Sequence, residues 1–148
     1  MNIESLLSRP VSALHSSATC AEAARRMRRQ NIGSIVVEED GAPIGIVTDR
    51  DLALRVVAEE LDPGAVTVGA IMTPFPAFLT AERDLRAALD VMREMHVRRL
   101  PAVNAKGRLI GVLSLDDVLI ELAEELGRVK DLLQLERAQK DLGEDFAA

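Results

Sequence analysis

The sequence predicts an α/β (α+β) protein of two pseudo-symmetric β-α-β-β-α repeats that pack through their sheets, with a C-terminal helical extension. The first observation is an internal repeat: the halves align without a gap at a constant offset up to Val37, pairing Ala23 with Ala88 and Met27 with Met92. A single insertion in the next turn increases the offset by one. The second is that both halves show the same order of strand and helix patterns. The third is length, since 148 residues hold two units of about 60, each individually marginal in size.

Each repeat is expected to begin with a short extended segment, over 11–14 in the first copy and 77–79 in the second, followed by a helix. Thr19 and Glu22 have the spacing of a capping box, which predicts the start of the first helix. Thr80 is expected to cap the second. Apolar residues recur at helical spacing after both caps, so each helix is expected to bury one face.

Two strands are predicted after the helix in each copy, over 35–39 and 43–48 in the first and over 100–103 and 108–114 in the second. They are mostly apolar and rich in Val and Ile, which predicts burial on both faces under a cover of helices. Turns ending in Asp-Gly and Lys-Gly join each pair of strands. A last helix is expected to start at Asp49 in the first copy and at Leu115 in the second.

These patterns divide the chain into a first repeat over 1–60, a linker over 61–67, a second repeat over 68–123 and a C-terminal helical tail over 124–148. An apolar seam with alternating steps of three and four residues enters the tail, through Leu119, Leu122, Leu126, Val129 and Leu133. It is too short to assign a coiled coil. Packing on the repeats fits it about as well as an interaction role, either as a dimer contact or as a handle for a partner protein. Gly127 is a point where the helix could break.

Composition excludes several classes of site. Three Phe with no Trp or Tyr leave few rings for stacking, so a base-binding pocket must have aliphatic walls. The single cysteine, Cys20, cannot form an internal disulfide or a multi-thiolate zinc site, and we expect it to be a small buried residue. His15 and His96 have no partner at metal-ligand spacing, so no metal site is assigned. No catalytic motif is present, so no catalytic residue is assigned and the chain is not expected to be an enzyme.

The net charge of −6 argues against broad binding to nucleic acid. Arg25, Arg26, Arg28 and Arg29 cluster on one predicted helix, which we interpret as a solvated face because no aromatic residue is interleaved for base stacking. Nucleic-acid binding through Arg25–Arg29 is the weaker alternative. The absence of a signal peptide and of a long apolar run predicts a cytoplasmic protein that does not enter the membrane.

The pattern Gly-apolar-apolar-Ser/Thr-x-x-Asp occurs twice, as Gly45, Thr48 and Asp51 and as Gly111, Ser114 and Asp117. Each copy lies where a strand is expected to enter a helix. A carboxylate there can accept two hydrogen bonds from a ribose diol, while a hydroxyl and free helix N–H groups face phosphate and glycine lets a ligand approach the backbone. The hydroxyl and the acid also fit a plain helix cap. Duplication of the whole context, including a glycine that capping does not need, favours a nucleotide site.

With these motifs, the repeated unit resembles a CBS domain and the tandem pair resembles a Bateman module. The similarity covers 3 to about 123 and also rests on Ile71-Met72-Thr73 and Arg99-Leu100-Pro101. It implies a stand-alone regulatory module with two clefts for adenosine-containing ligands: AMP, ADP or ATP, or sometimes S-adenosylmethionine or NAD. No other cofactor is expected to be required. We expect a homodimer that signals energy or metabolite state to an unidentified partner protein.

The resemblance also assigns roles to residues of this chain. The ribose acid corresponds to Asp51 and Asp117, and the hydroxyl near ribose and phosphate to Thr48 and Ser114. The residues that flank adenine correspond to Ser12 and Ala13 in the first copy and to Ala77 and Phe78 in the second. The basic residue that often contacts phosphate corresponds to Arg99, with Arg98 beside it.

The first copy departs from this pattern, with Gly33-Ser34 where the second has Arg98-Arg99 and with Val36 in place of Pro101. A polyphosphate would then be met unequally by the two copies, so one site is expected to bind more tightly. The alternative to a nucleotide-binding function is a ligand-free interaction or dimerisation module that acts through the C-terminal helix.

Overall fold

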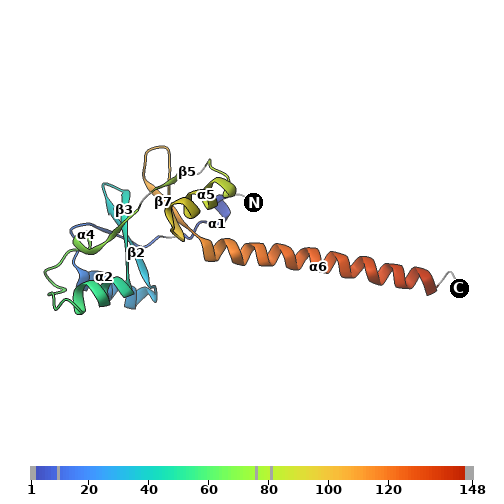
Figure 1. The fold of residues 1–148 in the computed structure, drawn as a ribbon, viewed down its shortest axis with the longest axis horizontal. Coiled ribbons are helices and arrows are strands. Elements are labelled where there is room, and N and C mark those ends of the chain that lie inside the picture. The colour runs from blue at the N-terminus through green and yellow to red at the C-terminus, as the bar shows by residue number, and fades with distance from the viewer. Residues whose placement is uncertain (1–2, 10, 76, 81, 146–148) are drawn as a thin grey trace. The chain divides into compact units, whose positions relative to one another are not determined.

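The computed structural model describes residues 3–9, 11–75, 77–80 and 82–145. The chain divides into two compact units, Met1–Ser114 and Leu115–Ala148. The first unit contains two small sheets with their helices, and the second is formed by one long helix (Figure 1).

The first repeat places a crossover helix between two parallel strands. Its elements are α1 (Ile3–Leu6), β1 (Ala13–His15), α2 (Cys20–Gln30), β2 (Ser34–Glu39), β3 (Ala42–Thr48), α3 (Asp49–Leu52) and the π-helical segment η1 (Ala53–Val57). β1 runs parallel to β2 with α2 between them, and β2 pairs antiparallel with β3. Asp40 and Gly41 join β2 to β3 with φ of 52° and 81°, the positive values that a type I′ hairpin turn requires.

The second repeat has a similar order of elements, with one additional short strand, β4 (Thr73–Pro74), after its first helix. Its elements are α4 (Val68–Ile71), β4, β5 (Leu79–Thr80), α5 (Leu85–Met95), β6 (Arg99–Val103) and β7 (Leu109–Ser114). β5 runs parallel to β6, with α5 as the crossover, and β6 pairs antiparallel with β7. The ladder registers shift between Val37 and Glu38 in one repeat and between Ala102 and Val103 in the other, which are equivalent places. The predicted α/β fold of two pseudo-symmetric repeats is confirmed.

Each repeat contributes its opening segment to the sheet of the other. β4, which opens the second repeat, pairs antiparallel with β3 of the first, with Thr73 opposite Ile46. Ser8, in the opening segment of the first repeat, bridges β7 of the second, and its N–H donates to the Val112 carbonyl at 3.0 Å. Ser8 is equivalent to Thr73 in the repeat alignment, and Ile46 is equivalent to Val112, so the repeat relates the two bridges. The exchange joins the repeats into one body.

Two glycines leave the space in which the exchanged segments cross the sheets. A Cβ on Gly45 would lie 2.5 Å from Met72 Sδ and 2.8 Å from the Thr73 carbonyl oxygen. A Cβ on Gly111 would lie 2.8 Å from Leu7 Cβ. Leu7 and Met72 are themselves equivalent in the repeat alignment. These glycines are therefore required by close packing between the repeats.

The two cores use equivalent residues. The pairs Leu14/Leu79, Ala23/Ala88, Met27/Met92, Ile35/Leu100 and Val47/Leu113 are all buried. β2 and β6 are buried over most of their length, as their apolar runs predict, whereas β3 alternates between buried and half-buried residues. Each sheet thus packs on a small core, and the two cores are built from equivalent residues of the repeats.

The start of the second helix corrects one prediction. Thr19 caps α2 as expected, its Oγ1 accepting a hydrogen bond from the Glu22 N–H at 3.2 Å. Thr80 does not cap α5. Asp84 does, because its Oδ1 accepts from the Ala87 N–H at 2.7 Å. Asp84 is the repeat equivalent of Thr19, so the register of the repeat marks the correct residue although its side chain is different.

The second unit is the helix α6 (Leu115–Asp145), which runs for 31 residues. It starts at Leu115, as α3 starts at Asp49, and both starts match the prediction. Gly127 does not break α6, and a Cβ at that position would meet no atom within 4 Å. Within the described residues, no helix has the length and apolar character needed to cross a membrane.

Gly45→Ala is expected to destabilise the protein by about 1–3 kcal/mol, because the new methyl group would collide with Met72 and with the backbone of β4. The matched control is Gly127→Ala, which enters open space within a helix and should not destabilise, since Ala favours helix by about 1 kcal/mol over Gly. Urea unfolding measures both. A Gly45→Ala protein as stable as the wild type would contradict the packing role.

Candidate functional site

A cavity of about 510 Å³ in the first unit is lined by residues of both repeats, and we call it the inter-repeat cavity. Its apolar wall consists of Val11, Ile32, Val36, Ile46 and Val112. Its polar lining consists of Ser8, Ser12, Gln30, Ser34, Arg99 and Ser114. The wall is aliphatic, as the scarcity of aromatic residues predicts for a base-binding pocket. A cavity of this size and mixture suits a small organic ligand.

Ser12 is the most informative residue of this cavity. Its Oγ is buried and has no hydrogen-bond partner among the described residues. A buried hydroxyl without a partner costs about 1–3 kcal/mol, and native proteins seldom leave one in that state. The hydroxyl therefore offers a free donor and acceptor at the wall of a cavity large enough for a ligand.

Arg99 and Ser114 are brought together by the ladder between β6 and β7, in which they are direct partners. Ser34 and Thr48 are partners in the same way at the equivalent place in the first repeat. Cross-strand partners present their side chains on one face of a sheet. The cavity thus has a cation and a hydroxyl from the second repeat on its wall, together with Ser12 of the first.

In the first copy of the repeated motif, Thr48 and Asp51 form a complete capping box on α3. The Asp51 N–H donates to Thr48 Oγ1 at 3.1 Å, and the Thr48 N–H donates to Asp51 Oδ2 at 2.9 Å. Asp51 Oδ1 also lies 3.6 Å from Arg55 Nη2. The structure therefore gives these two residues the local capping role, and neither lines the inter-repeat cavity.

Arg55 also connects the first repeat to the start of the second. Its Nη1 donates to the Ile71 carbonyl at 2.6 Å and to Thr73 Oγ1 at 3.1 Å. The Asp51 carboxylate is thus part of a network that holds the exchanged segment.

The two glycines of the repeated motif, Gly45 and Gly111, are covered by packed segments of the chain. The space above each glycine is filled by the opening segment of the other repeat, Met72 and Thr73 in one case and Leu7 in the other. Neither glycine lines the inter-repeat cavity. Duplication of the glycine therefore follows from duplication of the strand exchange.

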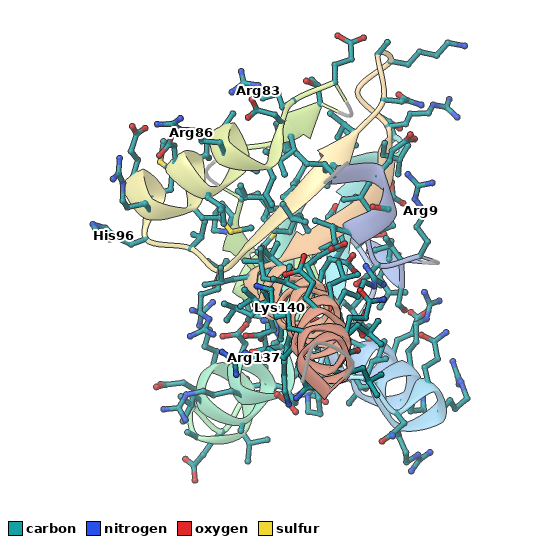
Figure 2. All side chains as sticks on the ribbon, turned by 90° about the vertical axis from the view of Figure 1, so that its right-hand side faces the viewer. Arg9, Arg83, Arg86, His96, Arg137 and Lys140 are labelled. Atoms are coloured by element: carbon teal, nitrogen blue, oxygen red, sulfur yellow. The ribbon has the colours of Figure 1, made fainter. Side chains whose placement is uncertain are left out.

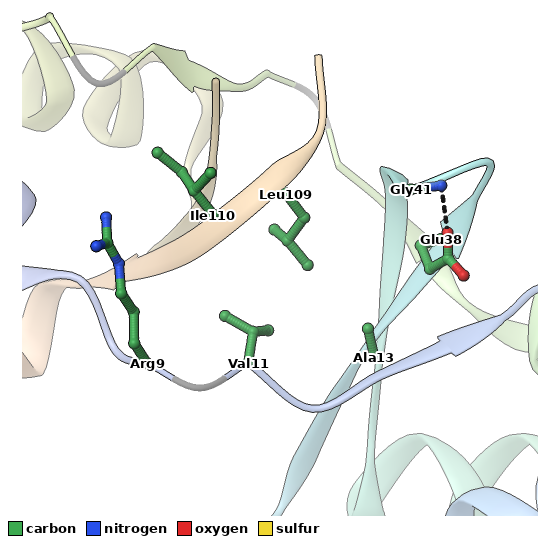
Figure 3. A pocket seen from close by; sticks show the side chains of 7 residues that line it. All are labelled: Arg9, Val11, Ala13, Glu38, Gly41, Leu109 and Ile110. Atoms are coloured by element: carbon green, nitrogen blue, oxygen red, sulfur yellow. Dashed lines mark hydrogen bonds between the residues drawn. The ribbon is translucent and has the colours of Figure 1, made fainter. Parts of the chain in front are cut away.

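Ala13 lies in a second cavity of about 490 Å³ rather than with Ser12 (Figure 3). Arg9 and Glu38 stand at its opposite ends, with apolar side chains such as Leu109 between them. Successive residues of an extended segment point in opposite directions, which separates Ala13 from its neighbour. The structure thus divides the two residues predicted to flank adenine in the first copy.

The remaining predicted site residues lie outside both cavities. Ala77 is half-buried and Phe78 is exposed, just before β5. Arg98 is exposed immediately before β6, and Pro101 is fully buried within that strand. Asp117 belongs to the first turn of α6, three residues after Ser114 in the chain.

Several lining residues were not predicted from the sequence. Gln30 at the end of α2 and Ser34 at the start of β2 add polar groups to the inter-repeat cavity. Ser34 is the repeat equivalent of Arg99, and Ile46 of Val112, so both members of two equivalent pairs line the same cavity. The sequence could have indicated Ser34 through its equivalence to Arg99 in the repeat alignment.

The arginines of α2 do not form one free basic face. The guanidinium of Arg26 donates to the Ala13 carbonyl and ties α2 to β1, whereas Arg25, Arg28 and Arg29 are exposed. Across residues 3–9, 11–75, 77–80 and 82–145, no three His, Cys, Asp or Glu residues lie together in a way that could hold a metal ion.

A family model described as the CBS domain matches residues 3–58 and 68–124. A CBS domain-containing protein of Bacillus subtilis, YhcV, is 31% identical over 119 residues, which cover 80% of this chain and 84% of that protein. A Methanopyrus kandleri protein is 37% identical over 102 residues, or 68% of this chain, and a Schizosaccharomyces pombe meiotically up-regulated protein is 38% identical over 97 residues, or 66%. The matches span only 52% and 13% of those two proteins.

Solved structures of several CBS-domain proteins are similar to this one. The CBS domain protein PAE2072 of Pyrobaculum aerophilum, in complex with AMP, has a TM-score of 0.68 and 30% identity and covers 84% of this chain and 99% of its own. Hypoxic Response Protein I, with two coordinated zinc ions, has a TM-score of 0.70 and 28% identity and covers 80% of this chain and 97% of its own. Hypoxic response protein 1 of Mycobacterium tuberculosis is 32% identical over 107 residues, 72% of this chain and 74% of that protein.

Cys20 is buried at the start of α2, as expected, and its burial raises the pKa of the thiol. The thiolate fraction at pH 8 should therefore be below that of a free cysteine, and the sulfur is shielded as well. We expect a maleimide or disulfide reagent to label native protein far more slowly than urea-unfolded protein. Labelling of the native protein at the rate of free cysteine would show that Cys20 is accessible and contradict this environment.

Proposed function

The chain belongs to the CBS-domain family as a tandem pair, a regulatory module in general, and we propose that it binds an adenosine-containing ligand in the inter-repeat cavity. AMP, ADP and ATP are the foremost candidates. The observation that carries the proposal is the buried Ser12 Oγ, which has no partner among the described residues and lies on the wall of that cavity. A ligand hydroxyl or ring nitrogen would satisfy it.

The walls of the cavity support a purine ligand. Val11, Ile32 and Val36 offer aliphatic surface of the kind that can sandwich a flat base without aromatic stacking. Gln30 and Ser34 add groups that can donate to or accept from a base edge. The AMP complex of the Pyrobaculum aerophilum protein, at 30% identity, is the precedent for this ligand class.

Arg99 supplies the positive charge that a phosphate requires. It is exposed at the start of β6, where the guanidinium can make two parallel hydrogen bonds to phosphate oxygens. Ser114, its strand partner, can add a hydroxyl. Asp117 is proposed as the ribose acid on the strength of the family resemblance and of its place three residues after Ser114 in the chain.

We propose that the site containing Arg99 and Ser114 is the tighter of two. To accept a ribose, Asp51 would have to share a carboxylate that already accepts the Thr48 N–H and pairs with Arg55. Ser34, which carries no charge, takes the place of Arg99 in the first repeat and lines the same cavity as Arg99. A phosphate bound beside Thr48 and Asp51 would therefore meet no arginine at the equivalent position.

A ligand can regulate the protein if the repeats adopt two arrangements that bind it with different affinity. A ligand that binds both arrangements equally well cannot shift the equilibrium between them. The inter-repeat cavity has residues from both repeats in its wall. A bound ligand would therefore link the two sheets in addition to the exchanged strands. A partner protein would then respond to this change.

The first test is titration with AMP, ADP, ATP, S-adenosylmethionine and NAD by calorimetry and thermal shift. A ligand at 100 times its dissociation constant should stabilise the protein by about 2.7 kcal/mol. Arg99→Gln should weaken nucleotide binding about tenfold. The matched control is Arg86→Gln, an exposed arginine that points outward from α5 (Figure 2). Equal loss in both variants, or no binding of any ligand, would contradict the proposal.

Ser12→Ala separates a ligand role from a structural one. Because the hydroxyl has no partner among the described residues, its removal should leave the free protein as stable or stabilise it by up to about 1 kcal/mol. The same change should weaken nucleotide binding several-fold, since the ligand loses a hydrogen bond. Urea unfolding without ligand and calorimetry with AMP measure the two effects. A destabilised protein with unchanged affinity would show that Ser12 serves the fold instead.

A further inference from the structure

α6 exposes a continuous apolar stripe. Its five seam residues are each between 40% and 70% exposed: Leu119, Leu122, Leu126, Val129 and Leu133. Steps of three and four residues keep their side chains on one side of the helix. A stripe of large aliphatic side chains on a monomer is the feature that marks an interaction surface.

The charged residues beside the stripe indicate which surface can bind it. With Leu119, Leu126 and Leu133 at the a positions of a heptad, Leu122 and Val129 occupy d. Glu125 then takes a g position and Lys130 the following e position. In a parallel pair of identical helices, each g residue faces the e residue five positions later on its partner. Glu125 would therefore face Lys130 of a second copy. Each pair of helices would have two such contacts.

Antiparallel pairing lacks this complementarity. It would set e residues against e residues, which brings Lys130 toward Ala123 or toward another Lys130. Glu125 would face Leu132 or a second Glu125. The sequence of the flanking positions thus favours the parallel arrangement.

The seam also has a defined end. The next d and a positions after Leu133 are Glu136 and Lys140, which would set like charges against each other in a parallel pair. Gly127 and Arg128 lie at b and c, away from the seam, where Arg128 donates to Glu125 Oε1 at 2.7 Å within the same helix. The apolar contact is therefore confined to residues 119–133.

We propose that α6 pairs in parallel with α6 of a second copy of this chain over residues 119–133. The contact buries the leucine seam of both helices and places Glu125 of each copy beside Lys130 of the other. It does not rest on the nucleotide proposal, because none of the residues that line the inter-repeat cavity belongs to α6.

Sedimentation equilibrium of the full chain without nucleotide tests the seam. Leu126→Glu should weaken dimerisation by at least about a hundredfold, because both copies lose a buried leucine. The matched control is Leu135→Glu, the same change at a position 61% exposed but outside the seam, which should leave the dimer intact. Both leucines are exposed, so neither change should unfold the protein. A monomeric wild type, a dimer that survives Leu126→Glu, or equal loss in both variants would overturn the proposal.

Charge reversal tests the orientation. Glu125→Lys and Lys130→Glu should each weaken the dimer several-fold, and the double variant should recover most of the loss. Leu133→Cys should form a disulfide-linked dimer on mild oxidation, since parallel helices place the two sulfurs side by side. In an antiparallel pair each a residue would meet a d residue, so Leu133 would face Leu122 and the two sulfurs would lie about 16 Å apart along the axis. A Leu133→Cys protein that links only to a Leu122→Cys protein would refute parallel pairing.

Discussion

The reciprocal exchange of opening segments is the constraint on which the rest of the first unit depends. β4 completes the sheet of the first repeat, and Ser8 bridges the sheet of the second, at positions that the repeat makes equivalent. Gly45 and Gly111 leave space for the crossing chains. Two units of about 60 residues each bury too little surface to be firmly stable alone. The exchange joins them, so the fold is a property of the pair.

The same exchange creates the candidate site. Because the opening segment of the first repeat runs along the sheet of the second, Ser12 comes to share a cavity with Arg99 and Ser114. An aliphatic wall, a cation and a buried hydroxyl with no partner among the described residues are thereby assembled from opposite halves of the chain. In the first copy of the motif, Thr48 and Asp51 satisfy one another in a capping box, and neither lines this cavity.

Much of this architecture could be predicted from periodicity and self-similarity. The repeat offset predicts the equivalent cores, the strands and the starts of α3 and α6, because these depend on local pattern. The hydroxyl of Thr80 suggests a cap, although the offset points to Asp84. The packing role of Gly45 is hidden in the sequence because its neighbour Met72 is distant along the chain. Ser12 and Arg99 share a cavity because of the strand exchange, and Ala13 lies in another cavity because its side chain points the opposite way. No local sequence pattern encodes either outcome.

If the exchange of segments builds a nucleotide site around Ser12, the position of the bound ligand is fixed by the fold. A crystal structure of the chain grown with AMP tests this claim most directly. We predict the nucleotide in the inter-repeat cavity, with Ser12 Oγ within hydrogen-bond distance of the ligand and the Arg99 guanidinium on the phosphate. AMP bound elsewhere on the protein, with Ser12 still lacking a partner, would contradict it.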